Sequence, residues 1–159
     1  MVNINIICVG KLKEKYLKDA IDEYSKRLSK YCKLNIIEVK DEIIPDTLNE
    51  KLTENIKSTE GIKILNNIKN SYIISLDLKG KEYTSEELSH KLENIVLNSN
   101  SIITFIIGGS LGLSKEVLDK SNELVCFSKL TFPHQLIRVF LLEQIYRAFK
   151  IQNNETYHK

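Results

Sequence analysis

The chain has 159 residues, of which 42% are hydrophobic and 28% are charged. This length and apolar content predict one globular domain over residues 1–159 with a buried core. The sequence has neither an apolar run long enough to cross a membrane nor a basic leader with a cleavage site, so we expect a cytoplasmic protein that does not bind membranes. A net charge of +2 is too small for a protein that binds nucleic acid by bulk electrostatics.

The first half of the chain alternates strands with helices. Residues 4–9 are typical of a buried strand, and the apolar residues between 12 and 28 predict a helix with one apolar face. Residues 34–39 predict a second strand. The apolar positions between 48 and 68 predict a second helix, which we expect to be interrupted near Gly61.

A third strand and a capped helix follow. Residues 72–76 predict the strand, and residues 77–80 a loop after it. Thr84 and Glu87 have the spacing of a capping box, so we expect a helix to begin there and to carry apolar positions over residues 88–96.

The last third of the chain contains the most apolar strand. Ile102–Ile107 is apolar almost throughout, which favours a central strand covered on both faces. A glycine-rich turn at 108–112 leads into a short helix from about Ser114, and residues 124–127 predict a fifth strand. The last helix runs over residues 133–151, because proline suits a first helical position.

This order predicts an α/β fold, with a mostly parallel sheet and helices on both faces. The last helix is apolar around most of its circumference, which predicts burial inside the domain or in a subunit interface. We therefore expect a homodimer.

The cysteines do not form a recognisable framework. Cys8, Cys32 and Cys126 are odd in number, far apart and in or beside apolar runs, whereas disulfides and zinc sites need paired cysteines. We expect reduced packing residues. The histidines lack metal-ligand spacing, so no metal site is expected.

The charges are distributed unevenly. Residues 10–33 carry eight basic residues against four acids, residues 129–159 carry five against two, and residues 41–60 carry six acids against two lysines. Solvated helix faces explain this pattern as well as an RNA-binding surface does.

Three loops lie where a parallel sheet binds ligands, beyond the carboxyl ends of its strands: 76–80, 108–113 and 127–132. The glycines at 108–112 would let a ligand approach the backbone, although glycine is also the simplest way to build such a turn. Their spacing fits neither a dinucleotide fingerprint nor a phosphate-binding loop, and Ser110 is not in a hydrolase motif.

The most informative stretch covers residues 127–135. A polar and aromatic loop ends there, and the helix after it presents His134, Gln135 and Arg138 on one side. A capped helix with polar residues at its start is the simpler interpretation. The convergence of this stretch with the other loops at one sheet edge favours a ligand site.

Five segments of the sequence are similar to those of a known protein family. They read I-I-C-V-G-K-L-K-E-K-Y, S-L-D-L-K-G-K, F-I-I-G-G-S-L-G-L, F-S-K-L-T-F-P-H-Q-L-I-R-V-F-L-L-E-Q-I-Y-R-A-F-K-I and Y-H-K. In content, order and total length, the chain resembles the ribosomal large subunit methyltransferase H family, RNA methyltransferases of the SPOUT class. It departs from the family at Leu111, where relatives often carry a polar residue.

The resemblance implies a SPOUT (alpha/beta knot) fold with a C-terminal trefoil knot, paired subunits, and S-adenosyl-L-methionine as methyl donor. The implied reaction is methylation of N3 of a pseudouridine in 23S (large-subunit) ribosomal RNA on assembled ribosomes. The positions that match the family's donor site are Leu76, Gly108, Phe127, Ser128, Lys129, Leu130, Thr131 and Phe132.

Methyl transfer needs an aligned nucleophile and a group that assists loss of the N3 proton. His134 and Arg138 are the catalytic candidates, the latter as a cation beside the developing anion. Tyr157, His158 and Lys159 would contact RNA across a dimer, or else form a frayed terminus. The alternatives are an enzyme of the same fold that methylates another RNA position, and a non-catalytic RNA-binding or ribosome-assembly module.

Overall fold

The computed structural model describes residues 1–98 and 100–159, and within them five parallel strands form one sheet. The spatial order of the strands is β2-β1-β4-β3-β5. The strands are β1 (Val2–Val9), β2 (Cys32–Val39), β3 (Tyr72–Glu82), β4 (Ile102–Ile107) and β5 (Glu123–Cys126). The helices are α1 (Lys15–Leu28), α2 (Glu50–Asn66), α3 (Ser85–Leu97), α4 (Lys115–Lys120) and α5 (His134–Gln152).

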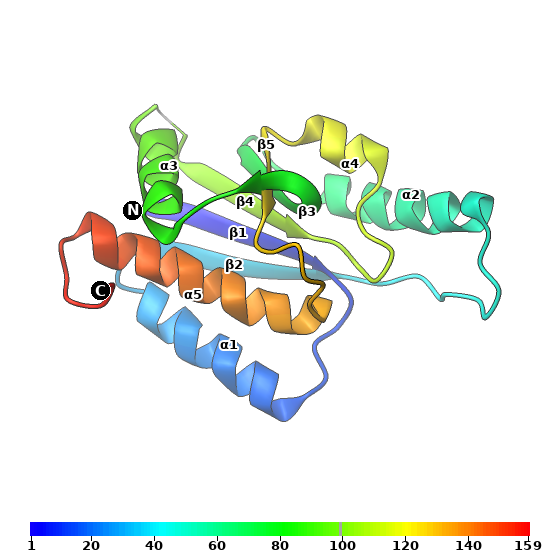
Figure 1. Ribbon diagram of the computed structural model, residues 1–159, viewed down its shortest axis with the longest axis horizontal. Coiled ribbons are helices and arrows are strands. Elements are labelled where there is room, and N and C mark those ends of the chain that lie inside the picture. Colours follow the sequence, from blue (N-terminus) through cyan, green and yellow to red (C-terminus); the bar gives the residue numbers. More distant parts are fainter. Residues whose placement is uncertain (99) are drawn as a thin grey trace.

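Helices cover both faces of the sheet, as predicted. Helices α1, α3 and α5 pack together on one face, and α2 and α4 lie on the other (Figure 1). Strand β4 pairs in parallel with β1 on one side and β3 on the other, so the prediction of a central Ile102–Ile107 strand is confirmed. The predicted mostly parallel α/β fold is therefore confirmed.

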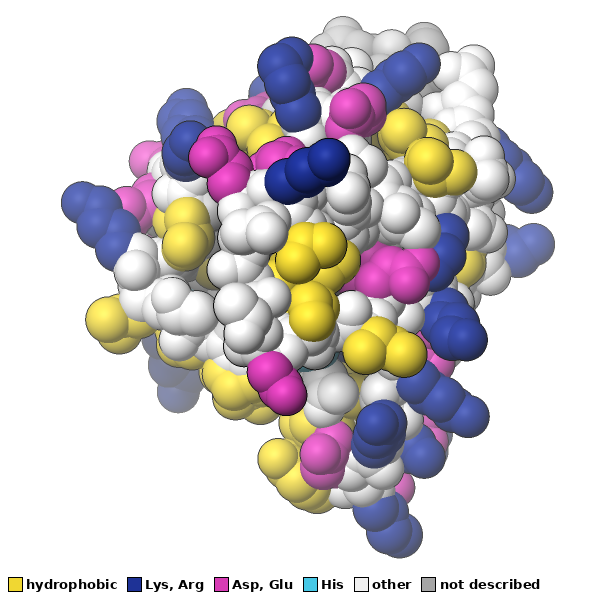
Figure 2. Space-filling view, turned by 90° about the vertical axis from the view of Figure 1, so that its right-hand side faces the viewer, with side chains coloured by type: hydrophobic (Ala, Val, Ile, Leu, Met, Phe, Trp, Pro, Cys, Tyr) yellow, Lys and Arg dark blue, Asp and Glu magenta, His cyan; other side chains and the backbone are white. Residues whose placement is uncertain are grey.

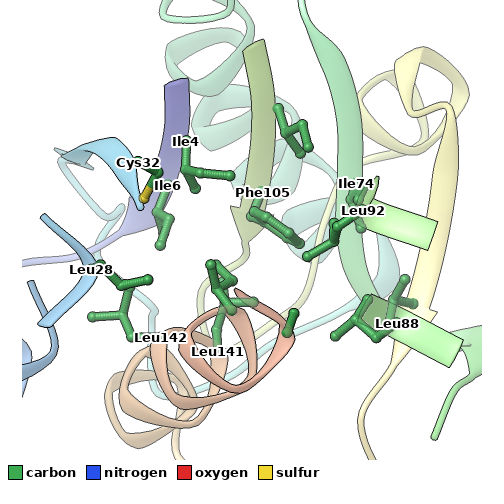
Figure 3. Close-up of a cluster of buried hydrophobic side chains, with 14 of the residues drawn as sticks. Ile4, Ile6, Leu28, Cys32, Ile74, Leu88, Leu92, Phe105, Leu141 and Leu142 are labelled. Atoms are coloured by element: carbon green, nitrogen blue, oxygen red, sulfur yellow. The ribbon is translucent and has the colours of Figure 1, made fainter. Parts of the chain in front are cut away.

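The core has one part on each face of the sheet. On the α5 face, Leu141 and Leu142 pack toward Phe105 and Ile6, and all four are buried (Figure 3). A smaller cluster on the other face packs around the fully buried Ile106. Each side chain of this kind contributes about 1.5–3 kcal/mol relative to an exposed position. This packing fixes the strand ends that carry the site.

The expected interruption of the second helix at Gly61 is wrong. Helix α2 runs unbroken from Glu50 to Asn66, and Gly61 is buried inside it. A Cβ atom at Gly61 would collide with the hydroxyl of Ser114, which caps α4 by accepting from the backbone of Val117 at 3.3 Å. This glycine therefore serves the close approach of two helices and does not break one.

The third strand is longer than predicted, because β3 continues to Glu82. Leu76 and Lys81 both pair with Val125 of β5, so residues 77–80 bulge out of the ladder instead of forming a free loop. A Cβ atom at Gly80 would lie 2.6 Å from the backbone of β5. Glycine is therefore required for the strand to return to its partner.

Smaller features of the sequence are confirmed or shifted by one residue. The capping box of Thr84 and Glu87 begins α3 as predicted. Strand β5 ends at Cys126 instead of 127, and α5 begins at His134 with Pro133 preceding it. The three cysteines are free and buried as packing residues. Burial raises the pKa of the Cys8 thiol to about 11, so it stays protonated.

Candidate functional site at the carboxyl edge of the sheet

A cavity of about 770 Å³ lies at the carboxyl ends of β3, β4 and β5. It is lined by residues 76–79, 107–113 and most of 125–134, which are the three segments that the sheet-edge argument selected. Its volume is in the range of small-molecule sites. Figure 2 looks onto this edge of the molecule and shows hydrophobic side chains gathered among charged ones.

Seven of the eight positions that the resemblance assigns to the methyl donor line this cavity; Lys129 is the exception among the described residues. The walls are mainly apolar, and the polar side chains among them are Asp77, Lys79, Ser110, Ser128, Thr131 and His134. A cavity with apolar walls and a few placed polar groups is typical of a site for a flat, partly polar small molecule.

The glycines shape the turn more than they clear space for a ligand. A Cβ atom at Gly108 would lie 3.0 Å from the side chain of Leu113 and 3.1 Å from the backbone of Gly112. Gly112 has a φ of +89°, which favours glycine, and its N–H donates to the Gly109 carbonyl at 3.1 Å. The side of Gly108 that lacks a side chain therefore faces the turn itself, as the simpler interpretation held.

Local contacts hold the loop before α5. The Ser128 hydroxyl accepts from the backbone N–H of Leu130 at 3.0 Å, and the Cys126 thiol donates to the Ser128 carbonyl at 3.1 Å. The ring of Phe132 packs edge-on against Phe140, with centroids 5.5 Å apart. Leu130 is left 71% exposed at the rim of the cavity.

His134 is the first residue of α5 and lies in the wall of this cavity, half-buried. Burial lowers the pKa of its imidazole, and the positive charge of Arg138 lowers it further, while Asp41 acts in the opposite direction. The ring is therefore neutral at neutral pH. A neutral imidazole at this place can accept a proton from a molecule in the cavity.

Arg138 lies on the same side of α5 as His134, one turn further on, but its guanidinium points to the strand ends. It is 3% exposed and lies outside the lining of the large cavity. Nη1 is 2.7 Å from a carboxylate oxygen of Glu38, and Nη2 donates to the carbonyls of Val9 at 3.2 Å and Gly10 at 2.8 Å. This side chain therefore ties α5 to the ends of β1 and β2.

The C-terminal tail is packed, so the expectation of a frayed terminus is wrong. The Tyr157 hydroxyl donates to Glu143 at 2.9 Å, and His158 lies 2.6 Å from Glu86 and 3.2 Å from Arg147. Arg147 is thirteen residues along α5 from His134, which is roughly 20 Å at 1.5 Å per residue. Within one chain, the tail and the large cavity are separate.

Two buried or partly buried acids at this edge were not predicted from the sequence. Glu38 accepts from Arg138 and from the backbone of Leu12 at 2.7 Å, and the signal for it was an acid within an apolar strand. Glu60 is buried beside Gly109 and accepts from the backbone of Glu42 at 3.0 Å; burial raises its pKa. No sequence pattern singled out Glu60.

Residues 1–98 and 100–159 contain no group of three or more His, Cys, Asp or Glu side chains arranged to hold a metal ion. None of their helices has the length and hydropathy needed to cross a bilayer.

The fold and the site define a class of protein: a parallel α/β domain with a small-molecule cavity at the carboxyl edge of its sheet. Residues 2–158 match the family described as Predicted SPOUT methyltransferase. A Clostridium botulinum (strain Eklund 17B / Type B) protein called Ribosomal RNA large subunit methyltransferase H is 65% identical over 99% of this chain and 100% of its own length. The Clostridium perfringens (strain SM101 / Type A) protein Ribosomal RNA large subunit methyltransferase H 1 is 62% identical over the same shares. The chain belongs to the SPOUT methyltransferases and, within them, to the ribosomal RNA large subunit methyltransferase H family.

Solved structures of more distant proteins share the fold. A probable methylase family protein from Haemophilus influenzae superposes with a TM-score of 0.54 at 16% identity, covering 99% of this chain and 71% of that one. A TrmH/SpoU tRNA modifying enzyme from Aquifex aeolicus gives 0.51 at 10% identity, covering 96% and 78%. At such identities the likeness concerns the fold alone.

Proposed function

We propose that this protein transfers a methyl group from S-adenosyl-L-methionine to N3 of a pseudouridine in 23S ribosomal RNA, on assembled ribosomes in the cytoplasm. The observation that carries the proposal is the cavity at the carboxyl edge, where the three expected loops converge and where His134, whose imidazole pKa is lowered by burial, lies in the wall. Relatives that share more than 60% of the sequence over its whole length bear the name of a large-subunit rRNA methyltransferase.

The residues present fit the methyl donor. The apolar walls at Leu76, Ile107 and Phe127 suit an adenine ring, and the polar Asp77 and Ser128 suit the ribose and amino-acid parts. The donor would be held by the backbone of the glycine turn and by residues 127–132. When bound there, it supplies an activated methyl group to a nucleophile that approaches in line.

His134 acts as the general base in this proposal. As the N3–methyl bond forms and the methyl–sulfur bond breaks, the N3 proton passes to the neutral imidazole. Arg138 contributes as a positioning residue, since its bonds to Glu38 and Gly10 hold the start of α5 and its charge keeps the pKa of His134 low. Both catalytic candidates then contribute to the same methyl-transfer step, His134 as the base and Arg138 by positioning His134.

Dimerisation through α5 completes the site in this proposal. Leu130 and Phe140 are apolar residues beside the cavity whose exposed fractions are 71% and 38%. A second copy of the chain would cover both side chains. An antiparallel pairing would also bring Tyr157, His158 and Lys159 of the partner subunit to the RNA entering the cavity. The C-terminal trefoil knot that the resemblance implies is part of this proposal.

The test is the methylation state of ribosomal RNA in cells with and without the gene, measured by mass spectrometry of nucleosides. The proposal expects a methylpseudouridine that disappears with the gene and returns with the wild-type chain. Its return with a His134→Ala chain at the wild-type level would contradict the role of His134. An unchanged map, together with no calorimetric binding of S-adenosyl-L-methionine, would favour the non-catalytic module.

A further inference from the structure

A second cavity, of about 280 Å³, lies at the same sheet edge but on the other side of Arg138. It opens between α1 and the strands β1 and β2, which lie side by side in Figure 1. Its floor is apolar, with Ile6, Ile21, Ile36 and Leu142 among the lining residues. The function proposed above makes no use of it.

Charged groups gather at this cavity. Lys11 and Lys18 are exposed residues in its lining, and Arg138 is buried there. The acids Asp22 and Glu38 also line it, so basic groups outnumber acidic ones by three to two. An apolar floor beneath a basic mouth suits a ligand with a flat apolar body and an anionic end.

Arg138 supplies an independent sign of a ligand. Among the described residues, its Nε is the one buried side-chain nitrogen or oxygen without a hydrogen-bond partner. A buried donor of a charged group is costly to leave unpaired, so an acceptor is expected in the working complex. Glu38 lies beside it and receives the bonds from Arg138 and Leu12 through Oε2. Within the described part of the chain Oε1 receives no such bond, so it can accept from a ligand.

We infer that this second cavity binds one nucleotide of an RNA strand, next to the nucleotide that enters the large cavity. The base lies on the apolar floor, accepts from the Nε–H of Arg138 and donates to Glu38, and its phosphate lies at Lys11 and Lys18. Each base has neighbouring donor and acceptor groups on its edges. This inference rests on the proposed RNA substrate.

The arrangement of the two cavities agrees with single-stranded RNA. His134 in the wall of the first and Arg138 in the wall of the second are four residues apart on α5, about 6 Å along its axis at 1.5 Å per residue. Proteins that read single-stranded RNA splay neighbouring bases into separate pockets and bind them by base edges and Arg groups. Two adjacent bases can therefore occupy the two cavities.

The test uses the full chain labelled with 13C at the isoleucine δ1-methyl groups and titrated with uridine 5′-monophosphate while NMR shifts are recorded. Ile21 and Ile36 line the second cavity and should shift in a saturable manner. Ile62 on α2, 60% exposed and outside the lining, should not shift. The Lys11→Ala/Lys18→Ala chain should bind about fivefold more weakly, the scale of losing solvent-exposed charge contacts. Lys26→Ala is the matched control, because Lys26 lies on α1 like Lys18 but outside the cavity.

Parallel titrations identify the ligand class. Equal shifts with inorganic phosphate alone would mean a plain anion site and would overturn the inference, as would the absence of any shift at Ile21 and Ile36. Shifts with uridine 5′-monophosphate that phosphate alone does not produce support it. A short single-stranded oligoribonucleotide should shift the same methyl groups at lower concentration.

Methylation of ribosomes separates this inference from the proposed function. The Lys11→Ala/Lys18→Ala chain should show a raised KM with kcat preserved, because the cavity binds substrate and transition state alike. Absence of methylation by the wild-type chain, with nucleotide-dependent shifts intact, would end the proposed function and leave the cavity a nucleotide site. Methylation with an unchanged KM in the double variant would overturn the inference alone.

Discussion

Replacing Arg138 with alanine should lower the free energy of unfolding by about 3 kcal/mol. Removing one partner of a buried ion pair costs about 3–5 kcal/mol. The lower end applies here, because the Glu38 side chain is 36% exposed and water can solvate it once the arginine is gone. The carbonyls of Val9 and Gly10 also lose the Nη2 donor, at 3.2 and 2.8 Å.

Urea unfolding of the wild-type and variant chains measures this change. Lys115→Ala is the control: its pair with Asp119 has side chains 81% and 61% exposed, and such pairs contribute no more than about 0.5 kcal/mol. Arg138→Lys should fall between the two, because one ammonium group cannot reach all three acceptors. A loss below about 1 kcal/mol for Arg138→Ala would refute the structural role argued here.

The same variant tests how Arg138 acts in the reaction. Methylation should fall by about two orders of magnitude with donor affinity nearly unchanged. Because the guanidinium lowers the pKa of His134, its removal should also move the acid limb of the kcat profile to higher pH. A normal fold with lost methylation and an unmoved limb would mean that Arg138 acts on the methylated base itself and not through His134.

Four other predictions follow from the site and the fold. The wild-type kcat should rise with pH through a pKa below 6.5, since only the neutral imidazole of His134 can accept the proton; His134→Gln should lower kcat about a hundredfold and abolish this limb. Gly80→Ala should destabilise by about 2 kcal/mol in urea, because its Cβ would lie 2.6 Å from the β5 backbone. Gly108→Val should weaken donor binding in calorimetry and also lower stability, since the new side chain meets Leu113 at 3.0 Å. A mixture of His134→Ala chains and chains lacking residues 157–159 should regain roughly a quarter of wild-type methylation if the site spans two subunits, and none if it does not.

The glycines show which parts of the fold can be predicted from the sequence and which cannot. Gly61 and Gly80 both looked like breaks in regular structure, yet one lies inside an unbroken helix and the other inside a long strand. Each is needed because another element comes close: α4 at Gly61 and β5 at Gly80. Those neighbours are far along the chain, so local patterns cannot reveal them. The buried strand Ile102–Ile107 was predictable because its position follows from its own hydropathy.

The candidate site shows the same limit, because contacts between residues far apart in the sequence cannot be predicted from local patterns. Spacing alone placed His134 and Arg138 on one side of a helix at the sheet edge, and this holds. It could not tell whether the guanidinium faces the cavity or the strands. That choice depends on Glu38, which is 100 residues away in the sequence and lies on a strand next to β1.

Helix α5 explains why one copy of the chain does not bring together all the residues proposed to act. Its first residue, His134, lies at the large cavity, and Leu141 and Leu142 in its middle are fixed in the core. The tail is bound to its far half, so a helix that rises 1.5 Å per residue keeps His158 roughly 20 Å from His134. The core contacts prevent the helix from sliding, and the bonds of Tyr157 and His158 hold the tail in place. A two-fold axis across α5, which makes the two helices antiparallel, therefore offers the simplest way to bring the tail of one protomer to the cavity of its partner.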